Sequence, residues 1–408
     1  MKALVLCGGM PQLYLLKELR RRGITSVLAD MNEKAPAVPF ADKFYPISTL
    51  DIGGIRKLAE DEKVDFVISV CADQMLLVAA QVCEELGLPC YIDYETAKNV
   101  SNKEFMKKIF VENDVPTTKY FVGEGLDEEK LADMVFPLVV KPVDAYSSRG
   151  VKKVQNKEEL VKAFEDAAHI SRNNKAVVEE FFGGDEYSVD LYIEDGIAKV
   201  LCVRLLDKIP GNQGFVICRG RYPAPLSEKV YEDIRLTGQK IADAFQLKNT
   251  PMLIQMKVEE ERLDVIEFCA RTGGGIKYRL MPYVSGFDVV KAVLDLTLGQ
   301  KPHYDGYHLN KYIVDEFIYC RPGVFDHLEN FEELLQKKII AHYDQFKAKG
   351  TVIKEASSSG DRVAYFSVEA DTMEELREKY DFINQKIQAV NDQGEDMIRH
   401  EIMQFADY

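Results

Sequence analysis

The chain lacks long hydrophobic runs and paired cysteines. No segment of its 408 residues approaches about 18 uninterrupted apolar residues, so a membrane-spanning helix is not expected, and the apolar run at 3–7 is too short for a signal peptide. The 8 cysteines form no CxxC pair and most of them lie in apolar stretches. These absences argue against a disulfide framework and predict reduced thiols and a cytoplasmic location.

Positive charge is also in deficit. The chain has 52 Lys and Arg against 67 Asp and Glu, which gives a net charge of −15. Such a chain repels phosphate backbones at long range, so a nucleic-acid partner is disfavoured, whereas a small anion in a local basic pocket stays open. The 46% hydrophobic and 29% charged content is that of a globular protein. At roughly 100 to 200 residues per domain, the length predicts two to four packed units.

The first ninety residues alternate short apolar runs with amphipathic stretches. This alternation is typical of a parallel sheet with crossover helices. The expected strands are 2–7, 26–30, 64–70 and 90–92, and the expected helices are 11–22 and about 74–86. We therefore predict an α/β, doubly wound parallel-sheet domain over residues 1–96.

Two further units follow, and the first has an α+β texture up to about residue 305. Its expected helices are 102–113 and 288–298, and its expected strands are 136–141, 177–182, 187–193 and 199–206. The remaining residues, 306–408, predict a small α/β cap. Its expected strands are 312–320 and 363–368, and its expected charged helices are about 329–338 and 373–390.

A glycine turn after the first expected strand allows two interpretations. Gly8 and Gly9, with Asp30 about twenty residues on, suggest a dinucleotide-binding loop and a nicotinamide-dependent oxidoreductase. The spacing is not GxGxxG and the third glycine is missing. A structural tight turn that faces a ligand is the other interpretation.

A strand that delivers a lysine to a loop of small residues is the sharpest signal. Lys141 is followed by Pro142 and by a loop that contains Ser147, Ser148 and Gly150. An ammonium group beside a row of backbone N–H groups suits polyphosphate oxygens. The stretch could equally be an ordinary strand and turn.

The second motif has two carboxylates on either side of a hinge. Glu179 and Glu186 are separated by an apolar pair and by the turn Gly183–Gly184. In a nucleoside pocket, main-chain groups of such a hinge read an adenine edge while the second carboxylate accepts the ribose hydroxyls. A charged hairpin is the competing interpretation.

The third motif is an expected hairpin over 253–258 and 263–269. Gln255 and Glu267 are candidate oxygen ligands for Mg²⁺, with Arg271 and three glycines directly after them. A structural ion pair between Glu267 and Arg271 is the alternative.

In this order, the three motifs resemble those of the ATP-grasp superfamily of carboxylate–amine ligases. The resemblance covers the whole chain and implies a three-part architecture of α/β and α+β units. It consists of the doubly wound domain at 1–96, an ATP-grasp domain at 97–305 with a lid subdomain at about 115–185, and a C-terminal cap at 306–408.

The resemblance also implies roles for single residues. Lys103 and Lys141 are the two phosphate-contacting lysines, Lys141 reaching the α- and β-phosphates, and Arg271 stabilises charge on the transferred phosphoryl group. Lys141 and Arg271 are thus the candidate catalytic residues. The other implied ATP ligands are Ser147, Ser148 and Gly150 for the triphosphate, Glu179 with the main chain of Glu180 and Phe182 for adenine, and Glu186 for ribose. Because Glu179 and Glu180 are adjacent, their register can shift by one.

The candidate metal ligands are Glu267 and Gln255, and the second departs from the family. Relatives carry Glu or Asp at the position of Gln255, and Asn at the position of Cys269, a soft ligand that Mg²⁺ does not prefer. Three outcomes stay open. One metal position is weaker, Glu259 or Asp264 compensates, or the chain binds nucleotide without efficient turnover.

The implied activity is an ATP- and Mg²⁺-dependent C–N ligase that works through an acyl phosphate. The cap, with its Arg321-Pro322-Gly323 stretch, resembles the L-amino-acid ligase branch. The expected partners are a small carboxylate and a small amine, with no nucleic acid and no membrane, and a homodimer is the candidate assembly. A non-catalytic ATP-binding sensor is the alternative. The candidate substrate cations are Lys208, Arg219, Arg221 and Lys277, with Arg204 and Arg279 beside them.

Overall fold

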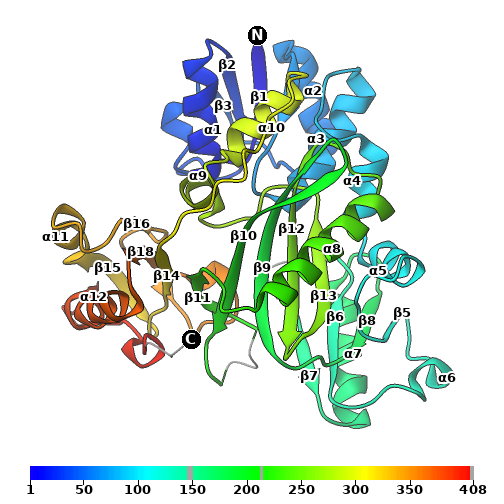
Figure 1. Ribbon diagram of the computed structural model, residues 1–408. Helices are drawn as coiled ribbons and strands as arrows, with labels where there is room; N and C mark the ends of the chain where they lie inside the picture. Colours follow the sequence, from blue (N-terminus) through cyan, green and yellow to red (C-terminus); the bar gives the residue numbers. More distant parts are fainter. Residues whose placement is uncertain (145–149, 212–214, 405–408) are drawn as a thin grey trace.

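The computed structural model describes residues 1–144, 150–211 and 215–404. The strands of these residues form sheets in the orders β3-β2-β1-β4, β5-β8-β6-β7, β13-β12-β9-β10-β11-β14-β18-β16 and β17-β15-β19. Figure 1 shows the first sheet at the top, the second at the lower right, and the cap in orange and red at the left. No helix in the described part of the chain is long and apolar enough to cross a membrane.

The N-terminal sheet is parallel and has helices on both faces. Alternate residues of β1 face opposite sides: Ala3 and Val5 share a core with α1 and α10, whereas Leu4 and Leu6 pack with α2 and α3. The elements are β1 (Lys2–Leu6), α1 (Met10–Arg21), β2 (Thr25–Ala29), η1 (Val38–Phe40), β3 (Lys43–Tyr45), α2 (Ile52–Glu62), β4 (Phe66–Ile68), α3 (Asp73–Leu86) and α4 (Tyr94–Val100). The doubly wound prediction is confirmed, because the apolar alternation buries both faces.

The expected strand at 90–92 is wrong, because no strand or helix is assigned between α3 and α4. The helix α3 ends at Gly87, which adopts the left-handed conformation (φ 64°). Tyr91 then donates its hydroxyl to the carbonyl of Ala270, so this segment packs on the central unit rather than on the sheet.

The second sheet forms the lid, and the helix α7 packs on its strands. Its elements are α5 (Lys103–Glu112) before the sheet, then β5 (Tyr120–Gly123), α6 (Glu128–Leu131), β6 (Leu138–Pro142), β7 (Lys152–Val154), α7 (Lys157–Ile170) and β8 (Ala176–Glu180). Asn102 caps α5 by accepting from the backbone of Phe105. In the lid core, Leu160 and Phe164 of α7 pack on Leu138 and Val178 of the sheet.

The long antiparallel sheet joins the central unit to the cap. Its central elements are β9 (Asp185–Glu194), β10 (Ile197–Lys208), β11 (Ile217–Tyr222), α8 (Glu228–Ala244), β12 (Thr250–Glu259), β13 (Arg262–Cys269), α9 (Lys277–Ser285) and α10 (Val289–Thr297). Strand β11 pairs with β14 of the cap, with Gly220 opposite Asp315. The sheet is therefore continuous across residue 305, and the boundaries at 96 and 305 stay a prediction.

The cap completes the fold. Its elements are β14 (Tyr312–Ile318), β15 (Gly323–Glu329), α11 (Phe331–Gln336), β16 (His342–Gln345), β17 (Val352–Ile353), η2 (Ser359–Asp361), β18 (Ala364–Ala370), α12 (Met373–Lys386), β19 (Gln388–Asn391) and η3 (His400–Ile402). The helix expected over 373–390 is too long. Ile387 is extended and buried, so the helix ends before it. Ala389 and Val390 pair with β15, and their buried apolar side chains pack within the cap.

Candidate functional site

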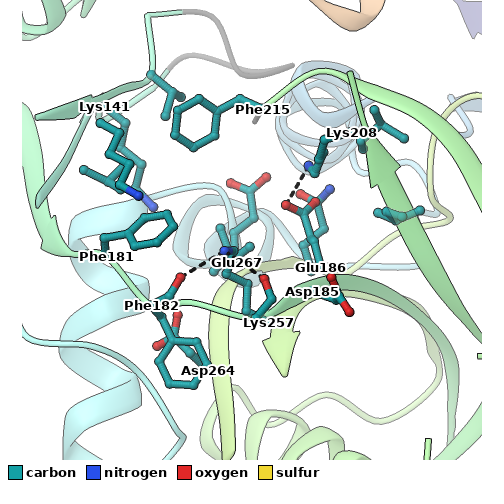
Figure 2. A pocket seen from close by; sticks show the side chains of 18 of the residues that line it. Lys141, Phe181, Phe182, Asp185, Glu186, Lys208, Phe215, Lys257, Asp264 and Glu267 are labelled. Carbon is teal, nitrogen blue, oxygen red and sulfur yellow. Dashed lines mark hydrogen bonds and ion pairs between the residues drawn. The ribbon is translucent and has the colours of Figure 1, made fainter. Parts of the chain in front are cut away.

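A cavity of about 640 Å³ lies between the lid and the long sheet. We call it the large cavity, and Figure 2 shows the side chains that converge on it. Its lining includes residues from every predicted motif, among them Lys103, Lys141, Glu179, Phe182, Glu186 and Glu267. The three motifs, which are far apart in the sequence, therefore meet at one place. This size is within the range of small-molecule sites.

A buried ion triad lies at the wall of the large cavity. Glu179 on β8 is 2.7 Å from Nζ of Lys141 on β6 and 2.8 Å from Nζ of Lys107 on α5. Burial alone would raise the pKa of Glu179, but the two lysines lower it to about 2. Lys141 also keeps a raised pKa despite its burial, because of Glu179 and the more distant Glu267. The Glu179 carboxylate thus favours the charged form of Lys141.

The triad engages the carboxylate of Glu179, which the resemblance assigned to the adenine hinge. The Glu179 carboxylate is held by Lys107 and Lys141. The backbone of Phe182 lies on the other side of the turn, where its carbonyl accepts from Nζ of Lys257 at 2.9 Å. The Glu180 carboxylate accepts a hydrogen bond from Val135 N at 3.0 Å.

Two lysines border the aromatic wall of the cavity. Nζ of Lys153 is 3.4 Å from the ring centroid of Phe181, and Nζ of Lys257 is 4.5 Å from the same centroid. Lys257 also donates to the carbonyls of Gly183 and Gly184. Desolvation by burial lowers the pKa of Lys257. The lysine thereby fixes the turn that carries the hinge, as Figure 2 shows.

The predicted ribose carboxylate is paired in the structure. Glu186 lies 2.7 Å from Nζ of Lys208, and both side chains line the large cavity. Gly150 is described and has a left-handed φ of 76°, which favours glycine at the end of the loop. Ser147 and Ser148 lie outside the described residues.

The candidate metal ligands face each other across a hairpin. Gln255 on β12 and Glu267 on β13 are register partners, and Lys103 Nζ lies 3.3 Å from the Glu267 carboxylate. Burial raises the pKa of Glu267, but Lys103 and Lys141 outweigh it, so the net shift is downward. Among the described residues, no group of three or more His, Cys, Asp and Glu side chains could hold a metal by itself. Two oxygen donors nevertheless fit Mg²⁺ that is shared with phosphates, since this ion uses one or two protein ligands together with phosphate and water.

The compensating carboxylates that the sequence suggested are not register partners of Gln255 or Glu267. Glu259 pairs with Arg262 at the tip of the hairpin. Asp264 is a buried lining residue of the large cavity, and its pKa is raised by burial although Lys107 lies nearby. Neither side chain shares the register position of Gln255 and Glu267.

A second cavity of about 290 Å³ adjoins the first, and we call it the small cavity. The two share a wall formed by Lys103, Leu206, Ile217, Gln255 and Glu267. The small cavity has an apolar part and a cationic part. Its apolar side chains include Leu76, Val100, Met106, Leu253 and Phe317, and its cations besides Lys103 are Arg204, Arg271, Lys277 and Arg362.

The structure divides the candidate substrate cations. Lys277 lines the small cavity, where it pairs with Asp190 and donates to Ser188. Lys208 and Arg219 line the large cavity instead. Arg221, which pairs with Asp207, and Arg279, which pairs with Asp344, do not occur among the described lining residues of either cavity. Arg221 is therefore not brought to the site as expected, although it lies two residues from Arg219 on β11 and both arginines pair with Asp207.

Several site residues were missed by the sequence reasoning. Lys107 lies one turn after Lys103 on the same helix face, and Lys257 lies two residues after Gln255 on the same strand face, so periodicity could have found both. Arg362 comes from the cap, where no spacing pattern marks it.

The glycine turn of the first domain is structural. Gly8 N donates to Oδ2 of Asp30 at 2.6 Å, so the acidic residue holds the loop itself. A Cβ at Gly8 would lie 2.7 Å from the Cβ of Ala35, which explains the need for glycine.

Comparison with known proteins matches two parts of the chain to domain models. Residues 134–279 match the model of the ATP-grasp domain, and residues 316–392 match the L-amino acid ligase C-terminal domain 2. The chain therefore contains an ATP-grasp domain. The first match contains Lys141, the hinge, Glu267 and Arg271, and the second contains Arg362.

Curated relatives of this chain include two that are named formate-dependent phosphoribosylglycinamide formyltransferase. The relative from Shewanella frigidimarina is 28% identical over 252 residues, which are 60% of this chain and 62% of the relative. The relative from Methanocaldococcus jannaschii is 27% identical over 199 residues, which are 47% of this chain and 50% of the relative. The chain thus spans between half and under two thirds of the length of these relatives.

Solved structures show the same fold at low identity. The L-amino acid ligase from Bacillus licheniformis superposes with a TM-score of 0.82 at 20% identity, covering 96% of this chain and 98% of that one. The phosphoribosylglycinamide synthetase from Anaerococcus prevotii gives a TM-score of 0.75 at 20% identity, covering 96% and 99%. The predicted three-part ATP-grasp architecture is confirmed.

Proposed function

We propose that this ATP-grasp protein is an ATP- and Mg²⁺-dependent carboxylate–amine ligase. The observation that carries the proposal is the wall shared by the two cavities, on which Lys103, Gln255 and Glu267 stand. A triphosphate in the large cavity and a carboxylate in the small cavity would meet at this wall. Holding two reactants at one point supplies a large part of the rate enhancement in such reactions.

The chemistry proceeds in two displacements. A carboxylate oxygen of the substrate attacks the γ-phosphorus, the bond to the bridging oxygen breaks, and ADP leaves with that oxygen. The amine nitrogen then attacks the acyl carbon, the carbon–oxygen bond to the phosphate breaks, and phosphate leaves with the proton that the amine loses. No side-chain nucleophile is required.

The chain's own charged residues bind and orient the phosphates. Lys141 and Lys103 neutralise phosphate oxygens from the large cavity, while Arg271 contributes positive charge in the small cavity beside the reacting group. Mg²⁺, bound through Glu267 and Gln255, would supply further charge neutralisation on the transferred phosphoryl group. Phe181, Phe182 and Lys257 form the nucleoside end, with the main chain after Glu180 as the base-reading edge.

Before nucleotide binds, these charged residues are paired with one another. Lys103 pairs with Glu267, and Lys141 pairs with Glu179. When phosphates arrive, the lysines gain new anionic partners, and Glu267 is released to a cation. The site therefore exchanges internal ion pairs for ligand pairs and never leaves a buried charge alone, which would be costly.

The substrates are amino-acid-like in this proposal. Support comes from the match of the cap to an L-amino acid ligase domain and from a small cavity that combines apolar and cationic linings. The alternative of a non-catalytic sensor is not favoured, because the relatives have the names of enzymes.

The test is ATP turnover by the purified full-length chain. Phosphate and ADP release are measured with Mg²⁺ and pairs drawn from the twenty amino acids, and products are identified by mass spectrometry. We expect stoichiometric ADP and phosphate only when both a carboxylate and an amine are present. Turnover that no carboxylate or amine changes would contradict the proposal. For variants of Glu267, Glu261→Gln serves as the matched control. Glu261 is exposed at the tip of the β12–β13 hairpin, on which Glu267 also lies, and it pairs with Lys229.

A further inference from the structure

Lys107 is a deeply buried lysine beside the site, and it faces neither cavity. It lies on α5, one turn after Lys103, and only 2% of it is exposed. Of the residues that the structure describes, the linings of both cavities include Lys103 but not Lys107. Any effect of Lys107 on a bound molecule therefore passes through its neighbours.

Three parts of the chain surround the Lys107 ammonium group. Its Nζ is 2.8 Å from Oε1 of Glu179 on the lid strand β8, donates to Oγ1 of Thr117 at 2.7 Å, and donates to the carbonyl of Val265 on β13 at 3.3 Å. A lysine ammonium group has three N–H donors, so these three oxygen atoms account for all of them. Of the three neighbours, Glu179 alone carries a charge. The charge of Lys107 is therefore directed at Glu179.

Glu179 connects Lys107 to the large cavity through Lys141. Its second oxygen, Oε2, is 2.7 Å from Nζ of Lys141, which does line the large cavity. The triad thus contains two positive charges and one negative charge, and Lys141 presents the surplus positive charge to the cavity. Without Lys107, the Glu179 carboxylate would neutralise Lys141 by itself, and the surplus would be lost. Such a change is felt strongly in a buried site, where charges are poorly screened.

Asp264 adds to the negative charge that Lys107 offsets. It is a buried lining residue of the large cavity, and burial raises the pKa of its carboxyl group while the charge of Lys107 lowers it. Lys107 therefore acts on two carboxyl groups of the cavity lining, those of Glu179 and Asp264. Uncompensated carboxylates at this place would repel the phosphates of a nucleotide, because like charges that face each other are costly.

We propose that Lys107 is a positioning residue that neutralises Glu179 and so leaves the charge of Lys141 for the phosphates of the nucleotide. The inference rests on the proposed function, since it takes the large cavity as the nucleotide site. It adds how that site keeps a net positive charge beside buried carboxylates. A purely mechanical role, in which Lys107 only ties the lid to the central unit, is the alternative that the experiment separates.

The experiment measures the binding of ADP and of adenosine to the full-length protein by calorimetry, at one Mg²⁺ concentration. Lys107→Met keeps a long side chain without the charge, and it should weaken ADP binding by about 10- to 100-fold. Adenosine has no phosphate, so its affinity should change by less than about 3-fold. Equal losses for ADP and adenosine would overturn the assignment, because a displaced lid affects the whole nucleoside site. Unchanged ADP affinity in a folded Lys107→Met protein would overturn it as well.

A charge-balanced double variant tests the role of charge directly. Lys107→Met combined with Glu179→Gln removes one charge of each sign, so the net charge beside the phosphates equals that of the parent. We expect its ADP affinity to lie within about 3-fold of the parent's, also where Lys107→Met alone fails to fold. A loss of about 10-fold or more in the double variant would contradict the proposal. Lys108→Met is the matched control, since Lys108 is an exposed lysine on the same helix that pairs with Glu112.

The binding measurement separates this inference from the ligase proposal, because it requires no turnover. Weaker ADP binding in Lys107→Met, with recovery in the double variant, supports the role of Lys107 even if no carboxylate and amine are joined. Ligation by a protein whose ADP affinity does not respond to Lys107→Met overturns the role of Lys107 and leaves the ligase proposal intact. A parent protein that binds no ADP overturns both.

Discussion

The Nζ of Lys103 lies 3.3 Å from Oε2 of Glu267, on the wall that separates the two cavities. The pair brings a residue from the first turn of α5 to the last strand of the central unit. Each partner is proposed to meet a different ligand, the lysine a phosphate and the carboxylate a cation. The resting pair thus stands where the reaction is proposed to occur.

Replacement of Glu267 tests the metal role. In Glu267→Gln we expect turnover to fall by about 100-fold or more, because the proposed Mg²⁺ ligand is lost and the negative charge on the reacting phosphoryl group is less well neutralised. ADP affinity should change by only a few-fold, since Lys141 and the hinge are intact. Phosphate release and ADP calorimetry measure the two quantities. A parallel loss of ADP affinity and turnover would instead make Glu267 a ground-state ligand.

Replacement of Lys141 tests the phosphate role. Lys141→Ala should weaken nucleotide binding, and it also removes one partner of the buried Glu179 carboxylate, at a cost of about 3–5 kcal/mol. The readouts are ADP calorimetry and urea unfolding. Lys152→Ala is the control, because Lys152 on the neighbouring strand β7 pairs with Asp166 at the surface. Equal ADP affinity in parent and Lys141→Ala would show that the phosphate end is wrongly assigned.

The sequence predicted the arrangement of the site better than its contacts. Apolar alternation located the doubly wound sheet, and the lysine, hinge and hairpin motifs converge as expected. The ion pairs of the site could not be predicted, because Glu179 contacts Lys107 only when the lid packs on α5. Arg362 reaches the small cavity through a sheet that runs from the central unit into the cap, and such long-range pairing leaves no local periodicity.

The pKa of Glu179 predicts how acid affects stability. Its folded value of about 2 lies below the ordinary 4.5, so the carboxylate contributes stability above about pH 4.5, and this contribution is lost as the pH falls towards 2. The amount is on the order of 3 kcal/mol. Urea unfolding of parent and Glu179→Gln at pH 7, 4 and 3 measures it. We expect the difference between them to shrink with acid, and a constant difference would contradict the charged triad.

The amide at position 255 predicts a weak metal site. Gln255→Glu adds a carboxylate opposite Glu267 and should lower the Mg²⁺ concentration for half-maximal turnover by about 10-fold. The titration is done at fixed ATP, with Gln246→Glu, in the turn after α8, as a distant control. If the parent shows no turnover and Gln255→Glu creates it, the natural chain is a nucleotide binder rather than a ligase.

Gly184 connects the hinge to the sheet beneath it. Its φ of 69° is left-handed, and a Cβ there would lie 2.1 Å from the carbonyl oxygen of Val258 on β12. Gly184→Ala should therefore cost about 1–3 kcal/mol and also weaken ADP binding, because Lys257 holds the same turn through the carbonyls of Phe182 and Gly184.

Gly125→Ala is the matched control for this change. A Cβ at Gly125 meets nothing within 4 Å, and its φ lies outside the left-handed range, so melting temperature and ADP affinity should stay near those of the parent. If Gly184→Ala lowers the melting temperature but leaves ADP affinity intact, the turn supports the lid without positioning the base. If Gly184→Ala lowers both the melting temperature and the ADP affinity while Gly125→Ala changes neither, the turn is part of the nucleotide site. A displaced turn would then also displace the main chain that contacts the nucleotide.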